Sequence, residues 1–160
     1  MRLLIAAVGK LKQGPERELC AHYLARAEAA GRALGIGPLS LIEVPESKGA
    51  TAASRRKQEA TALFAKLPSP HKLVCLDRTG EAMSSEAFAQ TLAKVRDEGA
   101  RALAFLIGGA DGLGQEALVR ADRRLSLGAL TLPHGLARIV LAEQIYRAAT
   151  ILAGHPYHRR

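Results

Sequence analysis

The sequence predicts an α/β domain built on a mostly parallel β-sheet with helices on both faces. Short apolar runs alternate along the chain with longer stretches of helical periodicity, an order typical of parallel strands joined by crossover helices. No linker, internal repeat or low-complexity tract divides the chain, and its 160 residues suffice to bury a sizeable core. We therefore expect one domain that covers residues 1–160.

The expected strands are apolar runs that end at glycine, proline or a polar turn. Four of them cover residues 2–8, 39–44, 72–76 and 102–107, and a fifth ends before Leu127. Runs that are apolar throughout are typical of strands buried on both faces of a parallel sheet. Residues 77–80, Asp-Arg-Thr-Gly, are expected to turn the chain at the end of the third strand.

The expected helices fill the intervals between these strands. Pro15 suits the first turn of the first helix, and Ser84 with Ser85 caps the third. Gly35 ends the first helix, and a Pro-Ser-Pro segment ends the second. The helices cover, approximately, residues 16–34, 52–67, 86–98 and 135–152.

The last helix is expected to be amphipathic. Arg138 falls on or beside its apolar face, where a guanidinium needs a partner, either a carboxylate across a dimer interface or a group in the ligand region. The alternative is that Arg138 extends to solvent. Five apolar positions repeat at 3.6-residue spacing along that face: Ala137, Leu141, Ile145, Ala148 and Leu152.

The charge balance favours a polyanionic partner. The formal net charge is +8, and nucleic acid is the first candidate for a protein of such charge. Residues 1–80 carry 13 Lys and Arg against 7 Asp and Glu, whereas residues 81–160 carry 10 against 8. Lys48 and residues 55–57 (Arg-Arg-Lys) are the candidate contacts, and a solvated basic surface that aids solubility is the alternative.

The cysteines and the opening segment indicate a cytoplasmic protein. Cys20 and Cys75 lack metal-type spacing and are expected to be free thiols in a reducing cytosol. Residues 1–8 are apolar but too few to span a membrane, and nothing there resembles a signal peptide. We therefore expect no membrane partner and no metal site.

Ligands of open α/β sheets bind beyond the carboxyl ends of the strands. Three such ends have the composition of a small-molecule cleft: Leu76 with Asp77, Gly108 with Gly109, and residues 127–132. Backbone at paired glycines can approach a ligand closely, although a plain strand-to-helix turn also explains them. No GxGxxG follows the first strand and no GxxxxGK[ST] occurs, which disfavours a ligand held by its phosphates.

Four segments, in order, resemble the RlmH family of SPOUT-class methyltransferases. They are residues 106–109 (Leu-Ile-Gly-Gly), 127–134 (Leu-Gly-Ala-Leu-Thr-Leu-Pro-His), 142–148 (Ala-Glu-Gln-Ile-Tyr-Arg-Ala) and 155–158 (His-Pro-Tyr-His). The resemblance covers essentially the whole chain, including Val8-Gly9-Lys10, and the four motifs together make it specific.

This resemblance implies a fold, an activity and partners. The family has an α/β fold whose C-terminal part forms a deep trefoil knot, and it works as a homodimer. It transfers a methyl group from S-adenosylmethionine to N3 of a pseudouridine in 23S rRNA on the assembled ribosome. General topology rules count against a threaded loop, so the knot rests on the resemblance alone. The implied cofactor pocket consists of Leu76, Gly108, Leu127, Gly128, Ala129, Leu130, Thr131 and Leu132.

Two positions depart from the family pattern. Residues 108–112 are Gly-Gly-Ala-Asp-Gly where the family commonly has Gly-Gly-Pro-Glu-Gly, so the acid is one methylene shorter and the stiffness of proline is lost. Gly135 stands where a proline often follows the histidine, and we expect a looser start of the last helix there.

The C-terminal quarter supplies the catalytic candidates, which are His134, Arg138, Tyr157 and His158. Attack by N3 on a sulfonium methyl requires loss of an imide proton, and histidine titrates near neutrality. Our hypothesis is that the tail of one subunit closes over the cofactor pocket of the other. His134 or His158 would help with the proton, and Arg138 would balance charge on the base.

The other tail residues have candidate roles as well. His155 is, like His134 and His158, a candidate for assisting with the proton, because histidine titrates near neutrality. Tyr157 would stack on a base, and Arg159 with Arg160 would contact phosphate. For each histidine a purely structural role is the alternative.

Three other functions stay open on the sequence alone. A non-catalytic ribosome- or RNA-binding module of the same fold predicts no binding of S-adenosylmethionine. A nucleotide-dependent oxidoreductase is disfavoured by the missing phosphate patterns. A SPOUT methyltransferase that acts on another RNA, such as tRNA, is the third, although the small size of the chain fits a ribosome that supplies its own docking surface.

Overall fold

The computed structural model describes residues 1–69 and 71–158. Pro70, Arg159 and Arg160 lie outside the described residues, and with them the predicted phosphate contacts of the two arginines.

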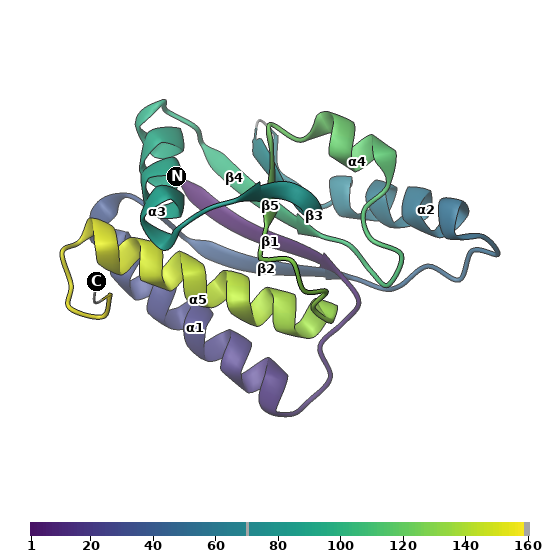
Figure 1. The fold of residues 1–160 in the computed structure, drawn as a ribbon, viewed down its shortest axis with the longest axis horizontal. Coiled ribbons are helices and arrows are strands. Elements are labelled where there is room, and N and C mark those ends of the chain that lie inside the picture. Colours follow the sequence, from purple (N-terminus) through teal and green to yellow (C-terminus); the bar gives the residue numbers. More distant parts are fainter. Residues whose placement is uncertain (70, 159–160) are drawn as a thin grey trace.

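One five-stranded parallel sheet forms the centre of the molecule, with the strand order β2-β1-β4-β3-β5 (Figure 1). The strands are β1 (Arg2–Val8), β2 (Leu39–Val44), β3 (Lys72–Ala82), β4 (Ala102–Ile107) and β5 (Arg123–Ser126). The helices are α1 (Pro15–Gly31), the 3-10 turn η1 (Arg32–Leu34), α2 (Ala52–Phe64), α3 (Ser85–Asp97), α4 (Gln115–Arg120) and α5 (His134–Leu152).

Helices cover both faces of this sheet, as predicted. Side chains of β1 alternate between two cores because successive residues of a strand point to opposite faces. Leu3, Ile5 and Ala7 pack with α1, α3 and α5, whereas Leu4 and Val8 pack with α2 and α4. Figure 1 shows the same division, with α1, α3 and α5 on one side of the sheet and α2 and α4 on the other.

The turn predicted at residues 77–80 does not end the third strand, because β3 continues to Ala82. Its pairing with β5 slips, so that Leu125 faces both Leu76 and Glu81 and the residues between them bulge out. Asp77 Oδ1 accepts the backbone N–H of Thr79 at 2.8 Å, which shapes a local turn inside the strand. The local turn chemistry was recognised correctly, but the strand resumes after it.

Helix α4 was not predicted. It comprises six residues, Gln115–Arg120, which is too short for a 3.6-residue pattern to develop. Its Ala117 is completely buried in the core on the α2 side of the sheet. This short helix leads into β5, the edge strand next to β3.

Helix α5 is buried on most sides rather than along one face. The predicted positions Ala137, Leu141, Ile145 and Ala148 are indeed buried, but so are Ile139 and several other residues off that face. The reason is that α5 packs between α1 and α3 above the sheet, and a helix with neighbours on several sides is apolar nearly all round (Figure 1). The predicted apolar face is present, but the prediction that the other sides of the helix are polar was wrong.

Candidate active site

All five strands run parallel, and the segments that follow β1, β2 and β4 lie on the right in Figure 1, where α5 also begins, whereas the chain leaves β3 toward α3 on the left. Cys75 of β3 pairs with Leu106 of β4, and Leu76 pairs with Leu125 of β5. The three predicted ends, at Leu76, Gly108 and Leu127, therefore lie on three adjacent strands. Their convergence at one edge is the arrangement expected of a ligand site in an α/β sheet.

The predicted cofactor residues of the last segment form the connection from β5 to α5. Leu127 and Leu132 are half-buried at its two ends, and Gly128 has a φ of +130°, which suits glycine. The residues between them are exposed, and the side chain of Leu130 is 84% exposed. The backbone of this segment is accessible to a ligand.

The segment after β4 is a tight turn in which Gly112 N–H donates to Gly109 O at 3.0 Å. A Cβ at Gly108 would lie 2.5 Å from the carbonyl carbon of Gly112, so only glycine fits. At Gly109 a Cβ would lie 3.0 Å from Val8 Cγ1 and 3.4 Å from Glu59 Oε2. Because neither glycine has a Cβ, the turn packs closely against its own last residues at Gly112 and against Val8 of β1.

Two residues of α2, one turn apart, anchor this turn and the segment after β2. Arg55 donates to both carboxylate oxygens of Asp111, at 2.7 and 3.2 Å, and to the carbonyl of Gly49 at 3.0 Å. The bond to Arg55 lowers the pKa of Asp111. Glu59, which is buried, accepts the backbone N–H of Ser47 at 2.9 Å. Asp111, which stands where the family commonly has the longer glutamate, therefore has Arg55 as its partner within the chain.

Arg138 occupies the centre of a buried polar cluster at the carboxyl ends of β1 and β2. Its Nη1 lies 2.5 Å from Glu43 Oε1, and its Nη2 donates to the carbonyls of Val8 and Gly9, each at 2.8 Å. The side chain is 0% exposed. Burial lowers the pKa of Arg138, and the charge of Glu43 opposes that effect. The predicted need for a partner is confirmed, but the partner is a carboxylate of the same chain, and Arg138 does not reach solvent.

His134 is the first residue of α5 and lies beside this cluster. Its Nδ1 is 2.5 Å from Arg138 Nη2, and its Nε2 is 3.9 Å from Glu46 Oε1. A Cβ at Gly9, whose φ is +83°, would lie 2.7 Å from His134 Cε1, so glycine there lets the ring pack against the backbone. The next residue, Gly135, is buried against Glu16, and the expected looser start of α5 is wrong.

Tyr157 packs against the middle and second half of α5. Its hydroxyl donates to Glu143 Oε1 at 3.0 Å, and its ring lies 4.6 Å from the ring of Tyr146. The guanidinium of Arg147 stands 4.9 Å from the centre of the Tyr157 ring, a cation–π distance. Burial and the bond to Glu143 raise the pKa of Tyr157 to about 12.

His158 is held by its own chain as well. Its Nε2 lies 3.0 Å from Oε1 of Glu86, in the first turn of α3. Its Nδ1 is buried and has no partner among the described residues. The pKa of Glu86 is lowered, first by its own backbone N–H and then by His158.

Within one chain the four catalytic candidates form two separate pairs. His134 and Arg138 lie in the first two turns of α5, whereas Tyr157 and His158 follow its last turn. The tail folds back onto α5, where Tyr157 bonds to Glu143, nine residues after His134 and therefore about 14 Å further along the helix axis at 1.5 Å per residue. A single chain therefore does not bring all four side chains to one point.

A cavity of about 300 Å³ touches part of the predicted cofactor site. Leu127 and Gly128 line it together with Ser85, Val140 and Gln144 from α3 and α5. The Ser85 hydroxyl donates to Gln144 Oε1 at 2.8 Å on its wall. This cavity extends the site from the exposed β5–α5 connection toward the packed helices.

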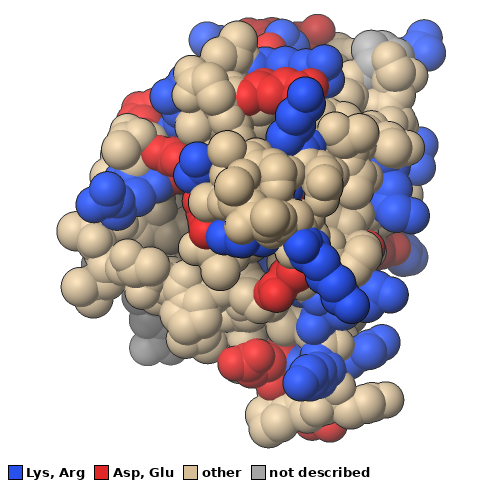
Figure 2. Space-filling view, turned by 90° about the vertical axis from the view of Figure 1, so that its right-hand side faces the viewer, with Lys and Arg blue, Asp and Glu red and all other residues tan. Residues whose placement is uncertain are grey.

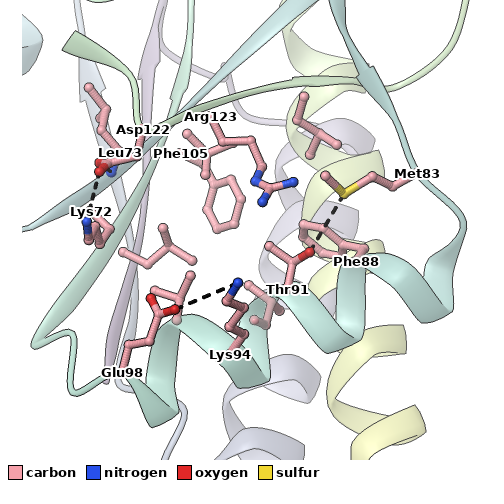
Figure 3. Close-up of a pocket in the computed structure, with 15 residues that line it drawn as sticks. Lys72, Leu73, Met83, Phe88, Thr91, Lys94, Glu98, Phe105, Asp122 and Arg123 are labelled. Carbon is pink, nitrogen blue, oxygen red and sulfur yellow. Dashed lines mark hydrogen bonds and ion pairs between the residues drawn. The ribbon is translucent and has the colours of Figure 1, made fainter.

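A second cavity, of about 240 Å³, lies between α3 and the sheet (Figure 3). Phe88 and Phe105 contribute to its apolar wall, and the Lys72–Asp122 ion pair stands at its rim. Met83, Phe88 and Leu125 line both cavities, so the second cavity continues from the first toward Lys72 at the start of β3.

Basic side chains surround the carboxyl edge. Figure 2 looks onto that side of the molecule and shows Lys and Arg around a centre of mostly uncharged residues. Lys48 and Lys57 are exposed, whereas Arg55 is bound to Asp111. Among residues 1–69 and 71–158, no cluster of three His, Cys, Asp or Glu suits a metal ion. In the same part of the chain, no helix has the length and apolar character needed to cross a membrane.

Several residues of this site were not predicted from the sequence. Glu43 lies in the apolar run of β2, and a single carboxylate in such a run was a signal that a buried cation faces it. Arg138 on an apolar helical face was the matching signal. No local pattern pointed to Glu59 or to the pairing of Arg55 with Asp111, because both depend on how α2 sits over the strand ends.

Comparison with known proteins gives one consistent result. The family model described as "Predicted SPOUT methyltransferase" matches residues 1–158. A protein of Xanthobacter autotrophicus called ribosomal RNA large subunit methyltransferase H is 52% identical over 159 residues, and the alignment covers 99% of each chain. The protein of the same name from Bradyrhizobium diazoefficiens is 51% identical with the same coverage.

The fold also resembles a solved structure. A probable methyltransferase from Bordetella pertussis Tohama I superimposes with a TM-score of 0.52 at 16% identity, covering 92% of this chain and 96% of that one. At that identity the similarity concerns the fold alone.

Proposed function

The chain belongs to the SPOUT methyltransferase family, and on that basis we propose that it methylates ribosomal RNA. Specifically, it transfers a methyl group from S-adenosylmethionine to N3 of a pseudouridine in 23S rRNA, on the assembled ribosome in the cytoplasm. The observation that carries the proposal is the identity of about half of all residues, over nearly the full chain, to proteins named as large-subunit rRNA methyltransferases. The trefoil knot that the resemblance implies is characteristic of this family and stays a prediction for this chain.

The residues at the carboxyl edge fit such a cofactor. Gly108 lies in a turn where a Cβ would strike backbone, so main-chain groups are presented without side chains in front of them. Leu76, Leu127 and Leu132 are half-buried and offer apolar surface for an adenosyl group. No phosphate cradle is needed, since the cofactor has no phosphates. When bound, S-adenosylmethionine supplies an electrophilic methyl group on a sulfonium.

The chain's own residues then bind the RNA base in line with that methyl group and assist the loss of the N3 proton. Alignment of the two reactants supplies much of the rate enhancement. His134 is a partly exposed polar group at this edge, Arg138 acts from its buried position behind it, and Tyr157 stays the candidate for stacking on a base.

A homodimer accounts for the separation of the catalytic candidates. If two copies of α5 run in opposite directions about a two-fold axis, the first turn of one approaches the tail of the other. Exposed leucines support a contact surface near the start of α5: Leu136 on α5 is 42% exposed, Leu19 on α1 is 45% exposed and Leu130 precedes α5. Gly135 packs against Glu16, which places the starts of α1 and α5 side by side.

The test is mapping of modified bases by mass spectrometry in ribosomal RNA from cells that lack the gene. We expect one N3-methylated pseudouridine to be missing and to return when purified protein and S-adenosylmethionine are added to the mutant ribosomes. Naked 23S rRNA serves as the comparison and is expected to be a poor substrate. An unchanged set of methylated bases in the mutant, together with no heat of cofactor binding in a calorimetric titration, would instead indicate a non-catalytic RNA-binding protein.

A further inference from the structure

We infer that Arg138, fixed by Glu43, holds His134 as the neutral tautomer whose proton is on Nε2, so that His134 donates a hydrogen bond to the substrate base and does not accept its proton. His134 is then a catalytic donor, and Arg138 and Glu43 are positioning residues. The inference rests on the proposed function for the identity of the substrate. The tautomer itself follows from the geometry of the chain.

The tautomer follows from what surrounds Nδ1. A guanidinium has only donors, and His134 Nδ1 lies 2.5 Å from Arg138 Nη2. A proton on Nδ1 would point at another N–H, so Nδ1 is the acceptor of this contact. A neutral imidazole with one nitrogen as acceptor carries its proton on the other. That nitrogen is Nε2.

Arg138 cannot turn away from this contact without losing others. Its Nη2 also donates to the carbonyls of Val8 and Gly9, each at 2.8 Å, and its Nη1 is bound to Glu43. Glu43 is held in turn, because its Oε1 accepts the backbone N–H of Leu11 at 2.8 Å. The whole side chain of Arg138 is excluded from solvent. In a buried place, acceptors that share one N–H group are more favourable than an acceptor left without any hydrogen bond.

The imidazole ring is fixed as well. A Cβ at Gly9 would lie within 2.7 to 3.2 Å of three atoms of the His134 ring, so the ring packs against the Gly9 backbone. Rotation about its axis is thereby restricted, and Nδ1 stays on the side of Arg138. Two contacts from different elements, β1 and α5, define the same ring orientation.

The opposite nitrogen is available to a ligand. Nε2 lies 3.9 Å from Glu46 Oε1, which is beyond hydrogen-bond distance, and the His134 side chain is 32% exposed. The charged groups near the ring are Arg138 on one side and Glu46 on the other, with Glu43 behind Arg138. A substrate oxygen is the kind of acceptor that this N–H lacks within the chain.

Such a donor suits the chemistry of an imide. As the N3–H bond breaks, N3 forms its bond to the methyl carbon while the bond from that carbon to sulfur breaks and leaves its electron pair on sulfur. The negative charge that develops on the base in this step spreads over the two carbonyl oxygens that flank N3. A fixed N–H aimed at one of them stabilises that charge without consuming the donor, and comparable donors contribute about 10²–10³-fold in rate. The N3 proton passes to solvent water and not to His134, because the only lone pair of this ring is bound to Arg138.

The first test is nitrogen NMR of the wild-type protein with labelled histidine. Comparison with His134→Gln identifies the signals of His134 among those of the five histidines. We expect Nδ1 of His134 to show the chemical shift of an unprotonated nitrogen and Nε2 that of a protonated one at neutral pH. A protonated Nδ1 would overturn the inference, whatever the substrate of the enzyme is.

The second test is kinetic and uses two substitutions. Glutamine places an amide N–H close to the position of Nε2, so His134→Gln is expected to retain methyl transfer within about tenfold of the wild type and with the same pH profile. His134→Ala is expected to lose about 10²–10³-fold in kcat with unchanged cofactor affinity. If the glutamine variant is as inactive as the alanine variant and its pH profile loses the limb at low pH, then His134 is a base. If the wild type methylates no ribosomal RNA, the proposed function fails while the NMR result still decides the tautomer.

Discussion

Arg138 and Glu43, which are 95 residues apart in the sequence, form an ion pair in which the arginine side chain is 0% exposed. The pair joins α5 to the carboxyl end of β2 and, through the carbonyls of Val8 and Gly9, to the end of β1. A charge buried in this way is tolerated only while its partners stay in place.

Removal of Glu43 is therefore expected to destabilise the fold strongly. Glu43→Leu leaves a guanidinium buried without its counter-ion, which costs about 3–5 kcal/mol in comparable cases. Urea denaturation should show a lower midpoint with an unchanged slope. The control is Lys94→Gln, which removes an exposed ion pair with Glu98 and should cost less than about 1 kcal/mol. Equal effects of the two substitutions would contradict the importance of the buried pair.

Gly108→Ala is expected to weaken cofactor binding. The added Cβ would meet the backbone of Gly112 at 2.5 Å, so the turn must open to accommodate it. We expect the affinity for S-adenosylmethionine, measured by calorimetry, to fall tenfold or more, which corresponds to about 1.4 kcal/mol. Ala110→Ser, at an exposed position of the same turn, is the matched control and should bind normally. Normal binding by both variants would place the cofactor elsewhere.

The docking of Tyr157 is expected to be lost at high pH. Its pKa is raised to about 12 by burial and by the Glu143 carboxylate, which disfavours the phenolate. The docked tail is thus fully stabilised below the ordinary tyrosine pKa near 10 and loses that contribution as the pH rises through about 12. Ultraviolet titration of phenolate should show one late tyrosine, which Tyr157→Phe removes and Glu143→Gln moves to lower pH. A titration of Tyr157 that is the same with and without Glu143 would speak against this contact.

Truncation after Gly154 is expected to abolish methyl transfer while the cofactor still binds. The tail carries Tyr157 and His158 but none of the predicted cofactor residues. Activity on ribosomes and calorimetry with S-adenosylmethionine separate the two effects. In mixed dimers of truncated chains with His134→Ala chains, partial recovery of activity would show that tail and pocket come from different subunits. Full activity of the truncated protein alone would refute the role of the tail.

Arg56→Ala is expected to flatten the salt dependence of ribosome binding by about one unit of slope, as loss of one phosphate contact does. Arg55→Ala should act differently, because Arg55 holds Asp111 and its loss loosens the turn after β4. The control is Arg101→Ala, an exposed residue just before β4 at the amino edge of the sheet. A slope that does not change in Arg56→Ala removes that residue from the RNA contact.

The sequence predicted well those elements whose pattern lies within one continuous and sufficiently long stretch of residues. The runs that became β1, β2 and β4 are mostly apolar, and Thr51 and Ser84 cap α2 and α3 with side-chain bonds. The end of β3 was missed, because its continuation depends on a slipped pairing with β5 that no local pattern records. The surroundings of α5 were missed for the same reason, since periodicity alone does not tell how many neighbours a helix has.

The site divides in the same way. The alternation of apolar runs and helices implies parallel strands. Parallel strands bring the segments after their carboxyl ends, which hold the predicted cofactor residues, to one edge of the sheet. The identity of Arg138's partner was not predictable, because Glu43 is distant in sequence and is brought opposite only by the register of β1 with β2. Physical chemistry gave the need for a counter-ion, and the fold decided which carboxylate meets it.

The burial of α5 between α1 and α3 has a consequence for how the protein is made. Its Leu141 and Ile145 complete the core that β1 begins, and the bond from Arg138 to Val8 spans 130 residues of chain. Contacts of such separation form late and slowly. During synthesis the first 130 residues are made while one face of the sheet is covered by α1 and α3 alone. The core on that face can close only after α5 has emerged.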